Sequence, residues 1–123
     1  MLIDTHALLW WLHDSEELSS SARDAIIEAE GARFFSPVSI YEIEWKVAQG
    51  RLGPYRVSIA AASRESGFRE LPLKSDHASF AARMTTDHRD PWVRLLAAQA
   101  ILSQMPLVTR DAEIQKLGVQ TIW

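Results

Sequence analysis

The sequence contains no cysteine, which excludes disulfide bonds and thiolate metal sites from this chain of 123 residues. It has no apolar run approaching the roughly 18 residues that a membrane-spanning helix needs. The N-terminus lacks a basic stretch followed by an apolar run and a small-residue cleavage site. We therefore expect a cytoplasmic protein with no membrane segment, folded as one domain over residues 1–123.

Several well-known catalytic motifs are also missing. There is no Gly-rich phosphate loop, no Gly-x-Ser-x-Gly nucleophile turn and no His-Glu-x-x-His helix. The four histidines show no metal-ligand spacing, so we expect them to be structural or exposed. The net charge of −3 argues weakly against nucleic-acid binding by simple electrostatics, but a divalent cation held by carboxylates would reverse the charge locally.

Short apolar segments alternate with helical patterns along the whole chain. This alternation predicts βαβ units and an α/β fold, a three-layer α/β/α sandwich with a central, mostly parallel sheet. Pro72 places the third predicted strand at an edge or a strand end. The predicted strands cover residues 2–5, 34–36, 68–73, 106–109 and 119–123; the predicted helices cover residues 6–12, 22–29, 39–48, 59–66, 76–84, 91–102 and 111–117.

The predicted helix over residues 91–102 is apolar almost throughout. Asp90 suits the N-cap and Pro91 the first helical position, where a missing N–H has no consequence. Only Arg94 and Gln99 interrupt the apolar run from Trp92 onward. Such a helix packs centrally, and by periodicity alone Val93 is an ordinary core residue.

Three acids follow predicted strands. Asp4 ends the first strand, Glu42 lies in the first turn of the helix after the second, and Asp111 follows the strand near Val108. In a parallel sheet all three project from one edge, where oxygen ligands suit Mg²⁺ or Mn²⁺. Each acid also has a structural explanation, because Asp4 and Asp111 suit N-caps and Ser39 with Glu42 forms a capping-box pattern.

The chain resembles the PIN-domain ribonucleases, in particular the VapC-like toxins of prokaryotic toxin–antitoxin pairs. The similarity runs from end to end and in order. The matching segments are Leu2-Ile3-Asp4-Thr5-His6-Ala7-Leu8-Leu9-Trp10, Ser39-Ile40-Tyr41-Glu42-Ile43, His88-Arg89-Asp90-Pro91, Arg94-Leu95-Leu96-Ala97-Ala98-Gln99-Ala100, Leu107-Val108-Thr109-Arg110-Asp111 and Gly118-Val119-Gln120-Thr121-Ile122-Trp123.

This resemblance implies an endoribonuclease in which Mg²⁺ or Mn²⁺, held by Asp4, Glu42 and Asp111, activates a water that attacks an RNA phosphodiester. A further family Asp belongs at position 93, where this chain has Val93. The resemblance also implies a cognate antitoxin and a homodimer as partners. Candidates for holding the RNA backbone are Lys46, Arg51, Arg89, Arg94 and Arg110.

Loss of the carboxylate at Val93 removes a charge and two ligand oxygens, so we expect weakened metal binding and little or no cleavage. The chain is then either an inactivated variant of an active toxin or a natural relative that binds without cutting. The alternative function is a non-catalytic PIN-fold module that docks an antitoxin or RNA. A phosphatase ranks last, because no Asp-x-Asp pair follows the first strand.

Overall fold

Five short parallel strands form the centre of the computed structural model, which describes residues 1–123. They pair in the order β3-β2-β1-β4-β5, so β3 is an edge strand, as Pro72 predicted. The short strands put the residues that follow β1, β2 and β4 at one edge of the sheet. The strands are β1 (Leu2–Ile3), β2 (Phe34–Phe35), β3 (Arg69–Glu70), β4 (Leu107–Val108) and β5 (Thr121–Ile122).

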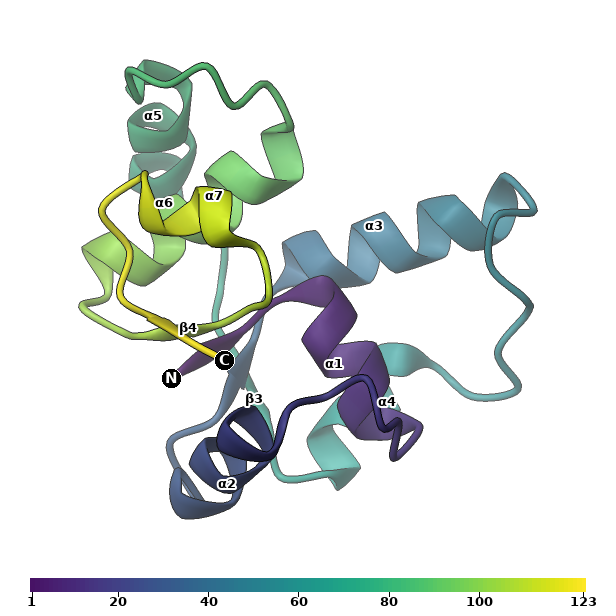
Figure 1. Ribbon diagram of the computed structural model, residues 1–123. Helices are drawn as coiled ribbons and strands as arrows, with labels where there is room; N and C mark the ends of the chain where they lie inside the picture. Colours follow the sequence, from purple (N-terminus) through teal and green to yellow (C-terminus); the bar gives the residue numbers. More distant parts are fainter.

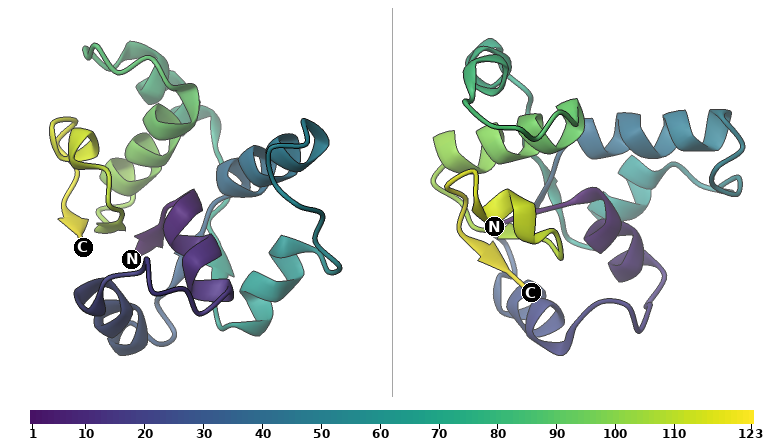
Figure 2. Two further views of the ribbon diagram at one scale, coloured as in Figure 1. Left: turned by 45° about the vertical axis from the view of Figure 1, so that its right-hand side comes forward. Right: turned by 45° about the horizontal axis from the view of Figure 1, so that its top comes forward.

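Seven helices cover the sheet and give the predicted α/β/α architecture (Figures 1 and 2). Helices α1, α2 and α4 pack on one face, α6 and α7 on the other, and α5 packs against α6. The two termini lie close together in every view. The helices are α1 (Thr5–Leu12), α2 (Ser20–Glu28), α3 (Pro37–Ala48), α4 (Ile59–Glu65), α5 (Ser75–Arg83), α6 (Pro91–Leu102) and α7 (Ala112–Gln115). None of them is both long and apolar enough to cross a bilayer.

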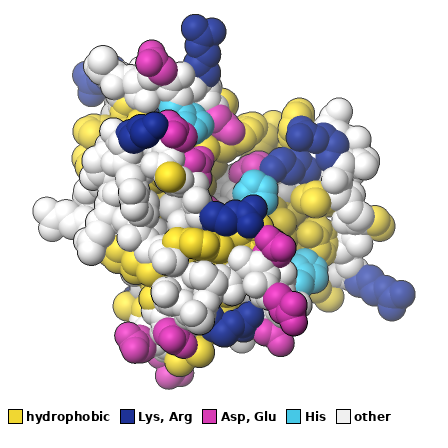
Figure 3. All heavy atoms as spheres, in the orientation of Figure 1, with side chains coloured by type: hydrophobic (Ala, Val, Ile, Leu, Met, Phe, Trp, Pro, Cys, Tyr) yellow, Lys and Arg dark blue, Asp and Glu magenta, His cyan; other side chains and the backbone are white.

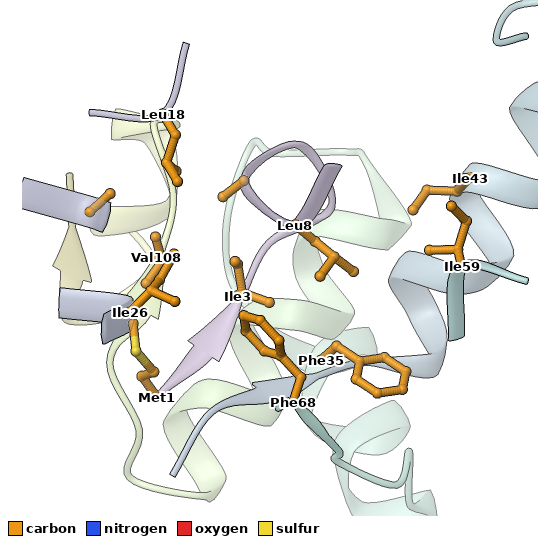
Figure 4. Packing of buried hydrophobic residues seen from close by; sticks show 12 residues of the cluster. Met1, Ile3, Leu8, Leu18, Ile26, Phe35, Ile43, Ile59, Phe68 and Val108 are labelled. Atoms are coloured by element: carbon orange, nitrogen blue, oxygen red, sulfur yellow. The ribbon is translucent and has the colours of Figure 1, made fainter. Parts of the chain in front are cut away.

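Successive residues of the two central strands enter opposite cores. Ile3 and Val108 belong to the cluster under α1, α2 and α4, which Figure 4 shows from close by. Leu2 and Leu107 belong to the second cluster, under α6 and α7. Successive side chains of a β-strand point to opposite faces of the sheet. Because helices cover both faces, both sets of side chains in these two strands are apolar. Apolar side chains therefore cover both faces of the sheet. The polar residues of the candidate site lie only at the strand ends.

The helix starts correct two details of the sequence analysis. Helix α3 begins at Pro37, with the Ser36 hydroxyl accepting from the Val38 N–H, so the predicted capping box of Ser39 and Glu42 is wrong. Helix α5 begins at Ser75, one residue before the predicted start. Helix α6 begins at Pro91, as predicted. The preference of proline for the first helical position also explains why α3 begins at Pro37, earlier than predicted.

The two polar interruptions of α6 each hold backbone from another element. Gln99 is fully buried; its amide oxygen accepts from the Ser36 hydroxyl and its amide nitrogen donates to the Leu71 carbonyl. Arg94 donates to the carbonyls of residues 81, 82, 84 and 88. Buried polar groups of this kind are stabilising only when paired, as they are here. Helix α6 is thereby tied to the ends of β2, β3 and α5.

Candidate functional site

A cavity of about 160 Å³ opens at the edge of the sheet where the strands end. Figure 3 shows acidic and histidine side chains gathered around a hollow on this face of the molecule. No Lys or Arg lines the cavity, so its ionisable lining consists of carboxyl and imidazole groups. The lining residues are the acids Asp4, Glu42, Asp90 and Asp111, the histidines His6 and His88, and Thr5, Val93, Leu96 and Ile114.

Asp4 lies at the floor of this cavity, directly after β1. It is buried, and one carboxylate oxygen accepts from the Ala7 N–H at 2.7 Å, which makes it the N-cap of α1. Burial raises the pKa of Asp4, and the neighbouring charge of Glu42 adds to the rise. Hydrogen bonds from Thr109 and Ala7 and the charge of His6 oppose it. Asp4 is therefore both the predicted cap and a desolvated carboxylate in a cavity.

Glu42 reaches the same cavity from the second turn of α3, and both of its oxygens are engaged. One accepts from the Thr5 hydroxyl and the other from the Lys46 ammonium group, each at 2.6 Å. Lys46 lies one helical turn further along α3, and its side chain is only 18% exposed. A cation of the protein itself thus neutralises the second acid of the site.

Asp111 completes the set of predicted acids on the side of β4. One of its oxygens accepts from the Glu113 N–H and caps α7, and its own N–H donates to the Thr109 hydroxyl. The other oxygen lies 3.8 Å from Nε2 of His88, in the loop before α6. Thr109 also hydrogen-bonds to Asp4, so one hydroxyl links the two carboxylate residues.

The histidines His6 and His88 were missed as site residues, because their spacing matches no metal motif. The signal that could have found them is position: His6 follows Asp4 by two residues, and His88 precedes the α6 start at the same edge. His77 has a structural role, as predicted, with its ring nitrogen accepting from the Lys74 N–H at the start of α5.

Val93 lies in the first turn of α6 and presents a half-buried apolar side chain to the cavity. Asp90 also lines the cavity, but it caps α6 by accepting from the Trp92 N–H at 2.9 Å. The residues of α6 that line the cavity, Val93 and Leu96, are apolar, so the helix itself supplies no carboxylate to the cavity. The apolar side chain also contacts the second core cluster, as periodicity predicted.

The residues present do not form a complete set of metal ligands. No group of three His, Cys, Asp or Glu side chains lies close enough together to hold an ion. The physical reasons are visible in the contacts, because Glu42 is paired with Lys46 and Val93 offers no oxygen. Mg²⁺ sheds its waters reluctantly and needs such charged ligands. The arrangement does not fit a tightly held divalent ion, and we derive no chemical step through one.

The five basic residues predicted to hold RNA occupy different surroundings. Lys46 is paired with Glu42, the Arg51 guanidinium lies 5.7 Å from the Trp45 ring, and the donors of Arg94 are taken up by carbonyls. Arg89 is exposed in the loop before α6. Arg110 lines a second hollow that shares Asp4 and Asp111 with the acidic cavity.

Comparisons with known proteins define the class to which this fold belongs. The family model for the PIN domain matches residues 1–120, and the chain belongs to the PIN domain family. No curated protein sequence shows significant similarity to the chain.

Solved structures with the same fold include VapBC of Salmonella typhimurium bound to DNA, with a TM-score of 0.72, 15% identity and coverage of 98% of this chain and 94% of that chain. VapBC2 of Rickettsia felis, bound to a DNA fragment from its promoter, has a TM-score of 0.71 and 11% identity, covering 98% and 95%. A toxin–antitoxin complex of Klebsiella pneumoniae has a TM-score of 0.60 and 16% identity, covering 91% and 87%.

Proposed function

We propose that this chain is the toxin-type member of a toxin–antitoxin pair, and that its acidic cavity is a metal-dependent ribonuclease site impaired by Val93. The observation that carries the proposal is the position of Val93, in the wall of a cavity lined by Asp4, Glu42 and Asp111. An Asp at this point of α6 would add a carboxylate to the same cavity. The similarity to a toxin–antitoxin complex supports a cognate antitoxin as partner, and a homodimer is part of the proposal.

The three acids would have distinct tasks in the restored site. Asp4 and Asp111 each keep one oxygen free of backbone N–H groups, and Thr109 holds the two residues in register. Glu42 would have to exchange the Lys46 ammonium group for the metal, which adds to the cost of metal binding in this chain. In the Val93→Asp chain, a divalent ion held by these carboxylates would supply an activated water and stabilise charge on the phosphate.

The test is an RNA cleavage assay with Mg²⁺ on the native chain, Val93→Asp, and Val93→Asp combined with Asp4→Asn. We expect Val93→Asp to raise cleavage by about tenfold or more, because a missing ligand oxygen and charge are restored. Asp4→Asn should abolish the gain while keeping the cap of α1, since an Asn side chain still accepts from the Ala7 N–H. A Val93→Asp chain that folds but does not cleave RNA would contradict the proposal.

That outcome would favour the second candidate, a non-catalytic PIN-fold module that binds an antitoxin or RNA. The pairing of Glu42 with Lys46 favours this candidate, because a protein cation already satisfies the acid that a metal would use. The two functions differ in Val93→Asp, which should stay inactive in a pure binding module and bind its partner as the native chain does.

A further inference from the structure

A second hollow, of about 250 Å³, lies directly beside the acidic cavity. Its walls are Asp4, His6, Trp10, Arg110 and Asp111. Three of these residues, Asp4, His6 and Asp111, also line the acidic cavity, so the two spaces share a wall. A chain-like ligand with its reacting group at Asp4 would therefore have its neighbouring unit in the second hollow.

Arg110 supplies a positive charge at this place. It follows β4 by two residues, and its guanidinium carbon lies 4.7 Å from the centre of the Trp10 ring. Its partner Glu17 is 2.9 Å away, but the two side chains are 56% and 63% exposed. Exposed ion pairs of this kind contribute between about zero and 1 kcal/mol, so a phosphate can displace Glu17. The Trp10 ring keeps the guanidinium oriented over the hollow.

Aromatic rings form another part of the wall. The exposed His6 ring lies 5.8 Å from the half-buried Trp10 ring at an interplanar angle of 35°, and Trp10 packs against Trp123 from the end of the chain. Packing against Trp123 and the core holds Trp10 in place without closing the hollow. A cation next to ordered aromatic rings is the combination that binds single-stranded nucleic acid, with bases stacked and phosphates paired.

We propose that His6, Trp10 and Arg110 form a subsite for one nucleotide of single-stranded RNA, with its phosphate on Arg110, its base against the exposed His6 ring, and Trp10 supporting both side chains. The nucleotide would lie beside the acidic cavity, on the side where Arg110 supplies the positive charge. This inference rests on the proposed function, because it takes RNA as the ligand. Among the five basic residues predicted to hold RNA, it selects Arg110, the one that lines a hollow beside Asp4.

The test is binding of a fluorescently labelled single-stranded RNA oligonucleotide to the native chain, measured by anisotropy with EDTA present. Arg110→Gln should weaken binding by about fivefold to tenfold and reduce the salt dependence by about one phosphate contact. Arg64→Gln is the matched control, because Arg64 is also 56% exposed and paired, with Glu70 at 2.6 Å, but lines neither hollow. Equal affinities for the two variants, or no RNA binding by the native chain, would overturn the subsite.

The aromatic part is tested with an oligonucleotide of the same length that carries abasic positions. The native chain should bind the intact RNA about fivefold more tightly than the abasic one, and His6→Ala should reduce this ratio. An unchanged ratio in His6→Ala, or equal binding of the two RNAs by the native chain, would overturn base stacking.

The two proposals fail separately. Cleavage by Val93→Asp, with unaltered RNA binding in Arg110→Gln, would refute the subsite alone. An inactive Val93→Asp chain, with weakened RNA binding in Arg110→Gln, would refute the nuclease and leave the subsite in place.

Discussion

Asp4 is kept buried in a position where its charge opposes folding. Burial raises its pKa, so the folded chain holds this proton more tightly than the unfolded chain does. Below the ordinary carboxyl pKa of 3.8 both states are protonated and Asp4 contributes no pH dependence. As pH rises from there to the raised pKa, the unfolded chain ionises first and the free energy of unfolding decreases. A buried carboxylate that lowers the stability of the folded chain is more typical of a functional residue than of a stabilising one.

We therefore expect Asp4→Asn to raise the midpoint of thermal unfolding by a few degrees at pH 7, since Asn keeps the acceptor for the Ala7 N–H and removes the buried charge. The difference between variant and native chain should shrink as pH falls toward 3.8. Calorimetry over a pH series in EDTA measures both effects. If the native chain is more stable than Asp4→Asn at pH 7, the charge of Asp4 does not destabilise the fold.

Single residues of the site differ in how well the sequence could foretell them. Asp4 and Asp111 follow strands directly, so their meeting at one edge follows from the topology of a parallel sheet. The pairing of Glu42 with Lys46 also had a signal, because residues four apart on a helix face each other. The approach of His88 to Asp111 had none, since it depends on the course of the loop over residues 84–90.

At the scale of elements, α6 carries the most consequences for the site. Its first turn puts Val93 in the cavity wall, and its Arg94 holds the carbonyls of the α5 end and of the loop that bears His88. The N-cap Asp90 and Pro91 were predicted from local preferences, which act within one turn. The role of Arg94 could not be predicted, because its acceptors belong to another helix and to a loop.

Arg94→Met should destabilise the chain by about 2 kcal/mol, because it leaves several partly buried carbonyls without a donor. Urea unfolding measures the loss. Arg83→Met is the control, since Arg83 is exposed and donates only to a carbonyl of its own helix, and it should change stability by less than about 0.5 kcal/mol. Equal losses in the two variants would show that Arg94 does not tie α6 to α5.

At the scale of the whole molecule, alternating apolar strands and helices sufficed to predict the layered α/β architecture. The strand order β3-β2-β1-β4-β5 lay beyond that pattern, because two-residue strands carry too few side chains to specify their neighbours. The hollow beside Arg110 could not be predicted from the sequence pattern either, because its wall combines residues from α1 and from the segment after β4. Such walls arise only when the chain is packed.

The same packing explains why this PIN-family fold does not depend on the acids at the sheet edge. The two hydrophobic cores lie on opposite faces of the sheet, whereas the acids lie at its edge. Val93 contacts the second core and also lines the cavity, so an apolar residue there is compatible with folding. Under the proposed function, a substitution at position 93 can therefore change metal binding without unfolding the chain.

The most direct test of the account is a pair of crystal structures grown with Mn²⁺, one of the native chain and one of Val93→Asp, compared by anomalous scattering. We expect a strong manganese peak beside Asp4 in Val93→Asp and a weak peak or none in the native chain at the same Mn²⁺ concentration. A fully occupied ion held by Asp4 and Asp111 beside Val93 in the native chain would contradict the claim that the missing carboxylate impairs the site.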